Sequence, residues 1–436
     1  MRLSSVLAAL ALFSAASPVF GAAQDEAAAQ QVSLVWWNHM EEGGPQNVLF
    51  KEYISEFEAE NPNIRVQMDN SQHEIYMNQK LPTAIATGDA PDLFAMTYRQ
   101  LFTYHENGSM APIDGAALEQ FGVSSIDGLK QQWAGGVLEA YQIGDNYYGI
   151  PWQFNIYSYS INTEHFRDAG LDPERDAPRY WEDVYEVGQK LVQKDASGRI
   201  TREALSFPFA LSAAWYLLEL EPIARARGGS ILNADQSESL ITSDAVVGAM
   251  EEIKRRFDDG LADKDLASAS DFHVSTIPTG NISMAVTGQW GPPRWTRQHD
   301  VAPGTFHAIP YPTYQGADPP ISTTSWAWVV SSTSEHKAEA WKLADFLTSF
   351  PSRNLLETGD TIPRAGWSET EGAKTIPQSA LWEELLGYSM PLANYQKYAD
   401  VSEPLKRAMQ EILLSDGDIR DTLARAKEEI DRSLAE

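Results

Sequence analysis

The sequence contains no cysteine among its 436 residues. The chain therefore has no disulfide and no thiol that could carry a lipid anchor. Basic residues are also scarce, since 33 Lys and Arg stand against 61 Asp and Glu, and the formal net charge is −28. No basic run is long enough to follow a phosphate backbone, so we expect no nucleic-acid partner.

Long apolar runs are missing after residue 23, where no segment reaches the roughly 18–20 apolar residues that a membrane-spanning helix requires. Residues 1–23 combine a basic start at Arg2, an apolar run over 6–13 and small residues at Gly21 and Ala23. This pattern is typical of a cleavable secretory signal peptide, with an uncleaved anchor helix as the alternative. We therefore predict export across an inner membrane into the periplasm.

Catalytic and metal-binding signatures are missing as well. The stretch "HEIYM" (73–77) approaches the zinc motif H-E-x-x-H but has Met77 where the second imidazole must stand. There is no P-loop, no G-x-S-x-G elbow and no EF-hand loop, and the 8 histidines lack ligand spacing. We predict no metal and no cofactor. One enzymatic alternative stays open, a secreted glycoside hydrolase or lyase that uses Glu41 or Glu42 with a second carboxylate.

The order of the predicted elements indicates an α/β protein. At about 100–200 residues per domain, the length suggests two or three domains. Strand-like and helix-like segments alternate at the start of the chain, which implies βαβ units and a largely parallel sheet. A second α/β region is expected from about residue 150. We expect strands at 32–37, 64–69, 92–96, 147–163, 282–295 (ending in a loop), 305–312 and 325–332, and helices at 48–62, 74–88, 180–193, 203–226, 243–259, 336–350 and 421–434.

Several of the 13 tryptophans follow or end predicted strands, beside hydrogen-bonding residues. Indole faces with amides, carboxylates and guanidinium groups around them suit the C–H faces and hydroxyls of a sugar. Neighbouring strand residues point to opposite faces, so Trp36 is expected in the core and Trp37 toward a binding rim. The rim set comprises Trp37 with Asn38 and His39, Trp152 with Asn155, Trp215 with Tyr216, Trp290 with Arg294, and Trp326 with Ser325.

Core packing is the competing interpretation for every tryptophan, because apolar bulk is usually buried. We expect one or two members of the rim set to be core residues. The tryptophans that we assign to the core from the start are Trp36, Trp133, Trp181, Trp328 and Trp341.

Four motifs resemble one protein family when they are taken in this order behind a signal peptide. They are "FEAENPNIRV" (57–66), "AIATGDAPDLF" (84–94), "YYGIPWQFNIYSYSINTEHFRDAGL" (147–171), and "ISMAVTGQW" (282–290) followed by "WAWVVSSTSEHKAEAWKLADFL" (326–347). Over nearly the whole mature chain, they resemble the extracellular solute-binding proteins (family 1) of ABC sugar importers. This class includes the maltodextrin-binding protein.

The resemblance implies an α/β, two-lobe periplasmic binding protein fold of type II, with hinge-linked lobes and a ligand cleft between them. It places 31–152 plus 305–357 in lobe one and 155–303 plus 360–436 in lobe two, with crossings at 151–155, 303–306 and 357–362. The implied function is non-enzymatic. A monomer would capture a sugar, sugar alcohol or small oligosaccharide by hinge closure and deliver it to permease subunits in the inner membrane. A polyamine, amino acid or metal chelate is a rival ligand that the tryptophans argue against.

The resemblance also implies ligand contacts at particular positions. These are Asn38, His39 and Glu41 after the first strand, Thr97, Tyr98 and Arg99 after the 92–96 strand, Asn155 in the crossover, Trp290 as a stacking residue, Trp215 and Tyr216 in a variable segment, Arg364, and Tyr398. Arg99 and Asn155 stand where the maltodextrin-binding pattern is acidic, which argues against maltodextrin. Arg99, Arg294 and Arg364 around one cleft would allow an anionic sugar such as a uronate, phosphate or sulfonate.

Overall fold

The computed structural model describes residues 31–436 except 135, 266–276, 377, 387 and 392–394. The expected signal peptide, 1–23, lies outside the described residues. The fold is built on one mixed sheet with the strand order β2-β1-β3-β11-β6-β9-β8-β7. Its strands are β1 (Val32–Asn38), β2 (Ile64–Asn70), β3 (Leu93–Thr97), β6 (Ile150–Asn162), β7 (Gln193–Lys194), β8 (Ile200–Leu205), β9 (Ile282–Gly288), β10 (Phe306–Ile309), β11 (Ile321–Val330) and β12 (Ser389–Pro391).

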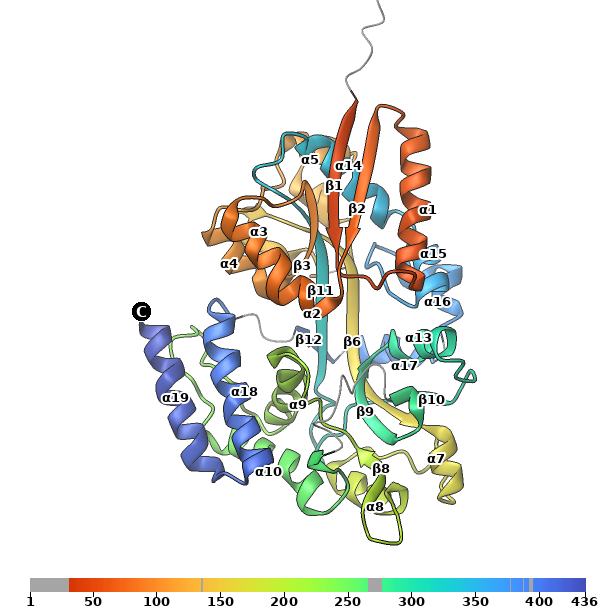
Figure 1. Cartoon of the computed structure of the whole chain (residues 1–436), viewed down its shortest axis with the longest axis vertical. Coiled ribbons are helices and arrows are strands. Elements are labelled where there is room, and N and C mark those ends of the chain that lie inside the picture. The colour runs from red at the N-terminus through yellow and green to blue at the C-terminus, as the bar shows by residue number, and fades with distance from the viewer. Residues whose placement is uncertain (1–30, 135, 266–276, 377, 387, 392–394) are drawn as a thin grey trace, which may run out of the picture.

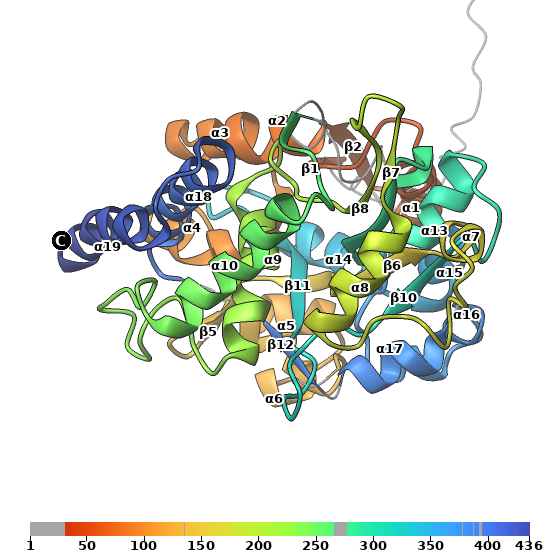
Figure 2. The same cartoon turned by 90° about the horizontal axis from the view of Figure 1, so that it is seen from below.

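Two lobes share the long strands β6 and β11, which run from the upper to the lower half of Figure 1. In lobe one, β1 pairs in parallel with β2 and β3, and β3 pairs with the end of β11 from Trp326 onward. In lobe two, the second half of β6 pairs with β9 and β10. A view from below shows helices around these central strands (Figure 2). The expected two-lobed α/β architecture is therefore confirmed.

Helices cover the sheet in both lobes. Lobe one contains α1 (Pro45–Glu60), α2 (His73–Ile75), a π-helical turn (Tyr76–Lys80), α3 (Leu81–Thr87), α4 (Leu101–Glu106), α5 (Gly115–Gln120), α6 (Ile126–Lys130), α14 (Lys337–Thr348), α15 (Pro351–Thr358) and α16 (Glu371–Lys374). Lobe two contains α7 (Thr163–Asp168), α8 (Trp181–Leu191), α9 (Ala213–Ala226), α10 (Asp244–Asp258), α13 (Gly291–Gln298), α17 (Ser379–Leu386), α18 (Tyr398–Ser415) and α19 (Ile419–Ala435). Four 3₁₀ turns and a hairpin complete the described elements: Tyr98–Gln100, Glu139–Tyr141, Ile277–Thr279, Trp367–Glu369, and β4 (Gln142–Ile143) with β5 (Asn146–Tyr147).

Pairing and hydrogen bonds describe the chain near two of the expected crossings. β10 pairs antiparallel with Tyr159–Asn162 of β6, and the chain then continues along β11, which pairs with both β6 and β3. After 357–362, Arg364 bonds to Gln132 and α16 packs on α15. The expected lobe boundaries stay a prediction. The C-terminal helices α18 and α19 pack on α9 and α10 of lobe two, as expected.

Two predicted elements were wrong in part. The segment expected as one helix over 203–226 begins as β8, which pairs in parallel with β9, and α9 starts only at Ala213. The sequence around Pro208 separates them, because proline restricts the residue before it to extended backbone. The loop expected after "ISMAVTG" is instead the helix α13, whose first turn tolerates proline.

The tryptophans assigned to the core are buried there. Trp36 packs edge-on against Phe50 and Trp328, with ring centroids 4.9 and 5.0 Å away. Trp133, Trp181 and Trp341 are also buried. In the described part of the chain, no helix is both long and apolar enough to cross a membrane.

Candidate functional site

Aromatic and charged side chains converge where β1 and β3 end, next to the shared strands β6 and β11. His39 follows β1 directly and stacks on Trp326 of β11, with ring centroids 3.8 Å apart and an interplanar angle of 26°. Its Nδ1 lies 3.2 Å from Nδ1 of His73, which belongs to α2. Ligands of open α/β sheets bind at the carboxyl ends of the strands, which is where these residues lie.

Lobe two contributes Trp290 and Arg294 from the start of α13. The Arg294 guanidinium lies 4.6 Å from the centroid of the Trp290 ring, and its Nη2 lies 3.8 Å from the carboxylate of Asp360. The indole packs closely on Gly288, because a Cβ at that position would lie 2.2 Å from Trp290 Nε1. Glycine therefore gives the indole the room it needs at the end of β9.

The charges of the two lobes act on each other across this region. The pKa of His39 lies well below its usual range because of burial first, then the proximity of His73 and the charge of Arg294. Burial and the charges of Arg99 and Arg294 lower the pKa of His73 to about 4, although its side chain is 44% exposed to screening solvent. Both imidazoles are therefore neutral at pH 7, and one Nδ1–H donates to the other Nδ1.

We call the residues that meet here the interlobe cluster. It comprises His39, His73, Arg99, Asn155, Tyr157, Trp290, Arg294, Trp326 and Tyr398. Within the described ranges, four cluster residues have a buried polar atom without a hydrogen-bond partner: His39 Nε2, Arg99 Nη1, Asn155 Oδ1 and the Tyr398 hydroxyl. The same holds for Nδ2 of Asn38, which precedes His39. Buried polar groups are nearly always hydrogen-bonded in native proteins, so these atoms are available to bond a polar ligand in the cluster.

Other predicted residues border the cluster. Tyr98 donates from its hydroxyl to the main-chain oxygen of Thr323 at 3.4 Å, and Thr97 is buried at the end of β3. Ser325 is buried in β11, where it pairs with Phe154 of β6. Trp215 meets the ring of Tyr157 edge-on, with centroids 5.9 Å apart.

Three predicted residues lie outside the cluster, and a fourth borders it from the core. The ring of Trp37 is covered by Lys80, whose Nζ lies 4.3 Å from the centroid. Trp152, the bordering residue, stacks on Trp328 in the core of lobe one with centroids 4.6 Å apart, and its ring centroid lies 6.2 Å from that of His39. Tyr216 is buried in lobe two and donates to Phe209 O at 2.8 Å, and Glu41 is exposed.

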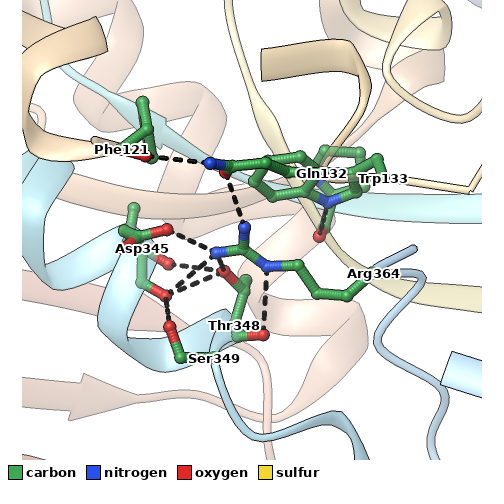
Figure 3. Close-up of polar contacts among 9 residues, drawn as sticks. Phe121, Gln132, Trp133, Asp345, Thr348, Ser349 and Arg364 are labelled. Atoms are coloured by element: carbon green, nitrogen blue, oxygen red, sulfur yellow. Dashed lines mark hydrogen bonds and ion pairs between the residues drawn. The ribbon is translucent and has the colours of Figure 1, made fainter. Parts of the chain in front are cut away.

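Arg364 is also outside the cluster, in a polar network of lobe one (Figure 3). Its guanidinium donates to Gln132 Oε1 at 3.0 Å and to Thr348 Oγ1 at 2.7 Å, and it pairs with the carboxylate of Asp345. It also lies 3.9 Å from the ring centroid of Trp133. The guanidinium of Arg364 is therefore bonded within lobe one.

Three residues were not predicted from the sequence. His73 and Tyr157 belong to the interlobe cluster, and Asp360 pairs with its member Arg294. His73 lies in the "HEIYM" stretch, where only a zinc motif was considered, and no set of three His, Asp or Glu side chains in the described residues could hold a metal. Tyr157 lies within the aromatic stretch of β6, where alternation shows which residues share a face but not which face meets the other lobe.

A two-lobed α/β protein with two shared strands and a polar, aromatic cluster between its lobes has the periplasmic binding protein fold of type II. The family model described as bacterial extracellular solute-binding protein matches residues 43–349, and the chain belongs to this family. The family resemblance seen in the sequence motifs is therefore confirmed.

Individual relatives agree with this assignment. The multiple sugar-binding protein of Streptococcus mutans is 23% identical over 332 residues, covering 73% of this chain and 71% of the relative. An ABC transporter solute-binding protein of Thermotoga lettingae, solved with α-D-tagatose, has a TM-score of 0.79 at 22% identity and covers 93% of this chain and 100% of its own. UgpB of Mycobacterium tuberculosis, solved with glycerophosphocholine, has a TM-score of 0.76 at 18% identity, with 92% and 98% covered.

Proposed function

We propose that this protein is the solute-binding component of an ABC importer and captures a sugar, sugar alcohol or small oligosaccharide between its lobes. The single observation that carries the proposal is that the cluster combines two indoles, those of Trp290 and Trp326, with buried polar atoms that have no hydrogen-bond partner in the described chain. A pyranose presents C–H faces that pack on indoles and hydroxyls that satisfy amides and guanidinium groups. The multiple sugar-binding relative and the tagatose-bound neighbour support this ligand class.

The mechanism we propose is closure about the shared strands. His39 and Trp326 belong to the lobe-one side of the cluster, and Trp290 and Arg294 belong to lobe two. A sugar that contacts both sides binds the closed arrangement more tightly than the open one, so it shifts the population toward closure. The closed, liganded form then docks on permease subunits in the inner membrane. We place the protein in the periplasm as a monomer after removal of its signal peptide, without a nucleic-acid partner.

Ligand capture without turnover fits the acidic residues better than glycoside hydrolysis does. Glu42, the candidate catalyst, is exposed and bonded to Lys51 at 2.5 Å and to Asn70 at 2.9 Å. Glu41 beside it is exposed as well. The family to which the chain belongs consists of binding proteins, which supports transport and gives the hydrolase or lyase alternative no support.

Thermal unfolding of the purified protein against a panel of neutral and acidic sugars tests this proposal. A ligand that binds only the folded state adds about 2.7 kcal/mol of stability at one hundred times its Kd, so the right sugar raises Tm by several degrees. The panel is also incubated with the protein and examined for products. A panel that leaves Tm unchanged, or sugars that are cleaved, would contradict the proposal.

A further inference from the structure

Arg99 has no acidic partner among the described residues, unlike Arg294 and Arg364, the two other arginines that the sequence placed at the cleft. Arg294 lies 3.8 Å from the carboxylate of Asp360, and Arg364 pairs with Asp345. Arg99 Nη1 is buried, and within the described part of the chain it has no hydrogen-bond partner. Arg99 as a whole is half-buried. Desolvation of the buried part of its guanidinium is unfavourable when no counter-charge offsets it.

Tyrosines surround Arg99 in place of a carboxylate. Its guanidinium carbon lies 5.6 Å from the ring centroid of Tyr398, on α18 of the other lobe. The charge of Arg99 also acts on Tyr98, Tyr141 and Tyr157. Burial raises the pKa of all these phenols, so they are neutral at pH 7. Neutral phenols can donate to an anion, but they do not compensate the charge of the guanidinium.

The titratable groups around Arg99 do not neutralise its positive charge. His73 is acted on by Arg99 and Arg294 and is neutral at pH 7, as described above. Glu221 of α9 acts on Tyr98 and Tyr398, whereas the charged or titratable groups that act most on Arg99 are the four tyrosines. The interlobe cluster therefore contains one guanidinium charge that the described chain does not neutralise.

We propose that Arg99 binds the carboxylate of an acidic sugar and that the ligand of the interlobe cluster is a uronate or a short uronate-containing oligosaccharide. This inference rests on the proposed function. A guanidinium fork pairs with a planar carboxylate through two parallel hydrogen bonds. One unpaired positive charge matches one carboxylate, whereas a sugar phosphate monoester carries about −1.5 to −2 charges at pH 7 and would leave an excess. Of the three arginines in the original expectation, the structure leaves only Arg99 for this role.

Calorimetry at pH 7 tests the assignment with matched pairs of sugars. The pairs are galacturonate with galactose, glucuronate with glucose, and the corresponding disaccharides, and glucose 6-phosphate serves as the phosphate probe. We expect at least one acid to bind the wild type tenfold or more tightly than its neutral partner. Arg99→Gln should bring that ratio close to one. Arg407→Gln is the matched control, because Arg407 is exposed on α18 and paired with Glu429, so it should keep the wild-type ratio.

Arg99→Lys keeps the assignment testable if the glutamine variant does not fold. Lysine retains the charge but loses the planar fork, so we expect an intermediate ratio. The inference is overturned if neutral sugars bind as tightly as their acids, if Arg99→Gln keeps the acid preference, or if glucose 6-phosphate binds more tightly than glucuronate. Binding of a neutral sugar alone, or of none of these sugars, overturns the inference about Arg99. The proposed function is then decided separately by the wider thermal-unfolding panel.

Discussion

At the scale of residues, the adjacent tryptophans Trp36 and Trp37 show what alternation predicts. Alternation assigns them to opposite faces, and Trp36 is fully buried beside Trp328, as predicted. Alternation does not predict which side chains cover the face of the strand that carries Trp37. Lys80 reaches over Trp37 from the π-helical turn. Side chains that arrive from distant segments therefore decide which strand-end residues face a ligand, and they are not visible in local sequence patterns.

Trp290→Ala tests the stacking residue of the cluster. The substitution removes one large apolar contact with the sugar, so we expect affinity to fall by ~1–3 kcal/mol. Calorimetry with the tightest-binding sugar measures the change. Trp367→Ala is the control, because Trp367 is a partly buried tryptophan of lobe one outside the cluster. Equal affinities of the Trp290 variant and the wild type would remove Trp290 from the site.

The neutral imidazoles of His39 and His73 predict how stability depends on pH. Their folded-state pKa values lie below the unfolded value of 6.5, so the unfolded chain takes up protons that the folded chain resists. The stability that they contribute is fully present above pH 6.5 and is lost as the pH falls toward about 4. The effect stays below ~1.4 kcal/mol per pH unit for His39 and is smaller for His73, which solvent screens.

Urea unfolding between pH 7 and pH 4.5 measures this dependence. The double variant His39→Gln, His73→Gln should lose stability less steeply than the wild type as the pH falls. His299→Gln, at an exposed position after α13, serves as the control. Parallel curves for the double variant and the wild type would show that the histidine pair does not resist protonation.

At the scale of elements, amphipathic helices and alternating strands could be predicted, and the prediction failed where pairing with a distant strand decides the local structure. The helices at 48–62, 243–259 and 421–434 appear as α1, α10 and α19 with small shifts of their ends. The error at 203–226 arose because β8 is a short strand inside an otherwise helical pattern. Residues 203–205 form a strand because they pair with β9, which is far away in the sequence.

Arg364→Gln distinguishes a structural arginine from a ligand contact. The variant loses charge-assisted hydrogen bonds to Gln132 and Thr348 and leaves Asp345 without its partner, so we expect a loss of about 1.5–3 kcal/mol in the free energy of unfolding. Urea denaturation measures it, and sugar affinity should be retained at a temperature where the variant is folded. Unchanged stability combined with lost sugar binding would restore Arg364 to the ligand site.

At the scale of the whole molecule, the order of the motifs indicated two hinge-linked lobes, and the structure has them. The contacts of β10 and of Arg364 near the expected crossings could not be predicted, because their pairing and hydrogen-bond partners are distant in the sequence. The cluster combines residues that follow β1 and β3 with residues of α2, β6, α13, β11 and α18, and these are separated by most of the chain. Only the folded topology brings them together.

Small-angle X-ray scattering with and without the sugar identified by thermal unfolding tests the central claim most directly. Closure of two lobes on a ligand makes the molecule more compact, so saturating sugar should lower the radius of gyration of the wild type. The same sugar concentration should lower it less in Trp290→Ala, because fewer molecules are liganded. A bound sugar that leaves the radius of gyration unchanged would contradict capture by closure between the lobes.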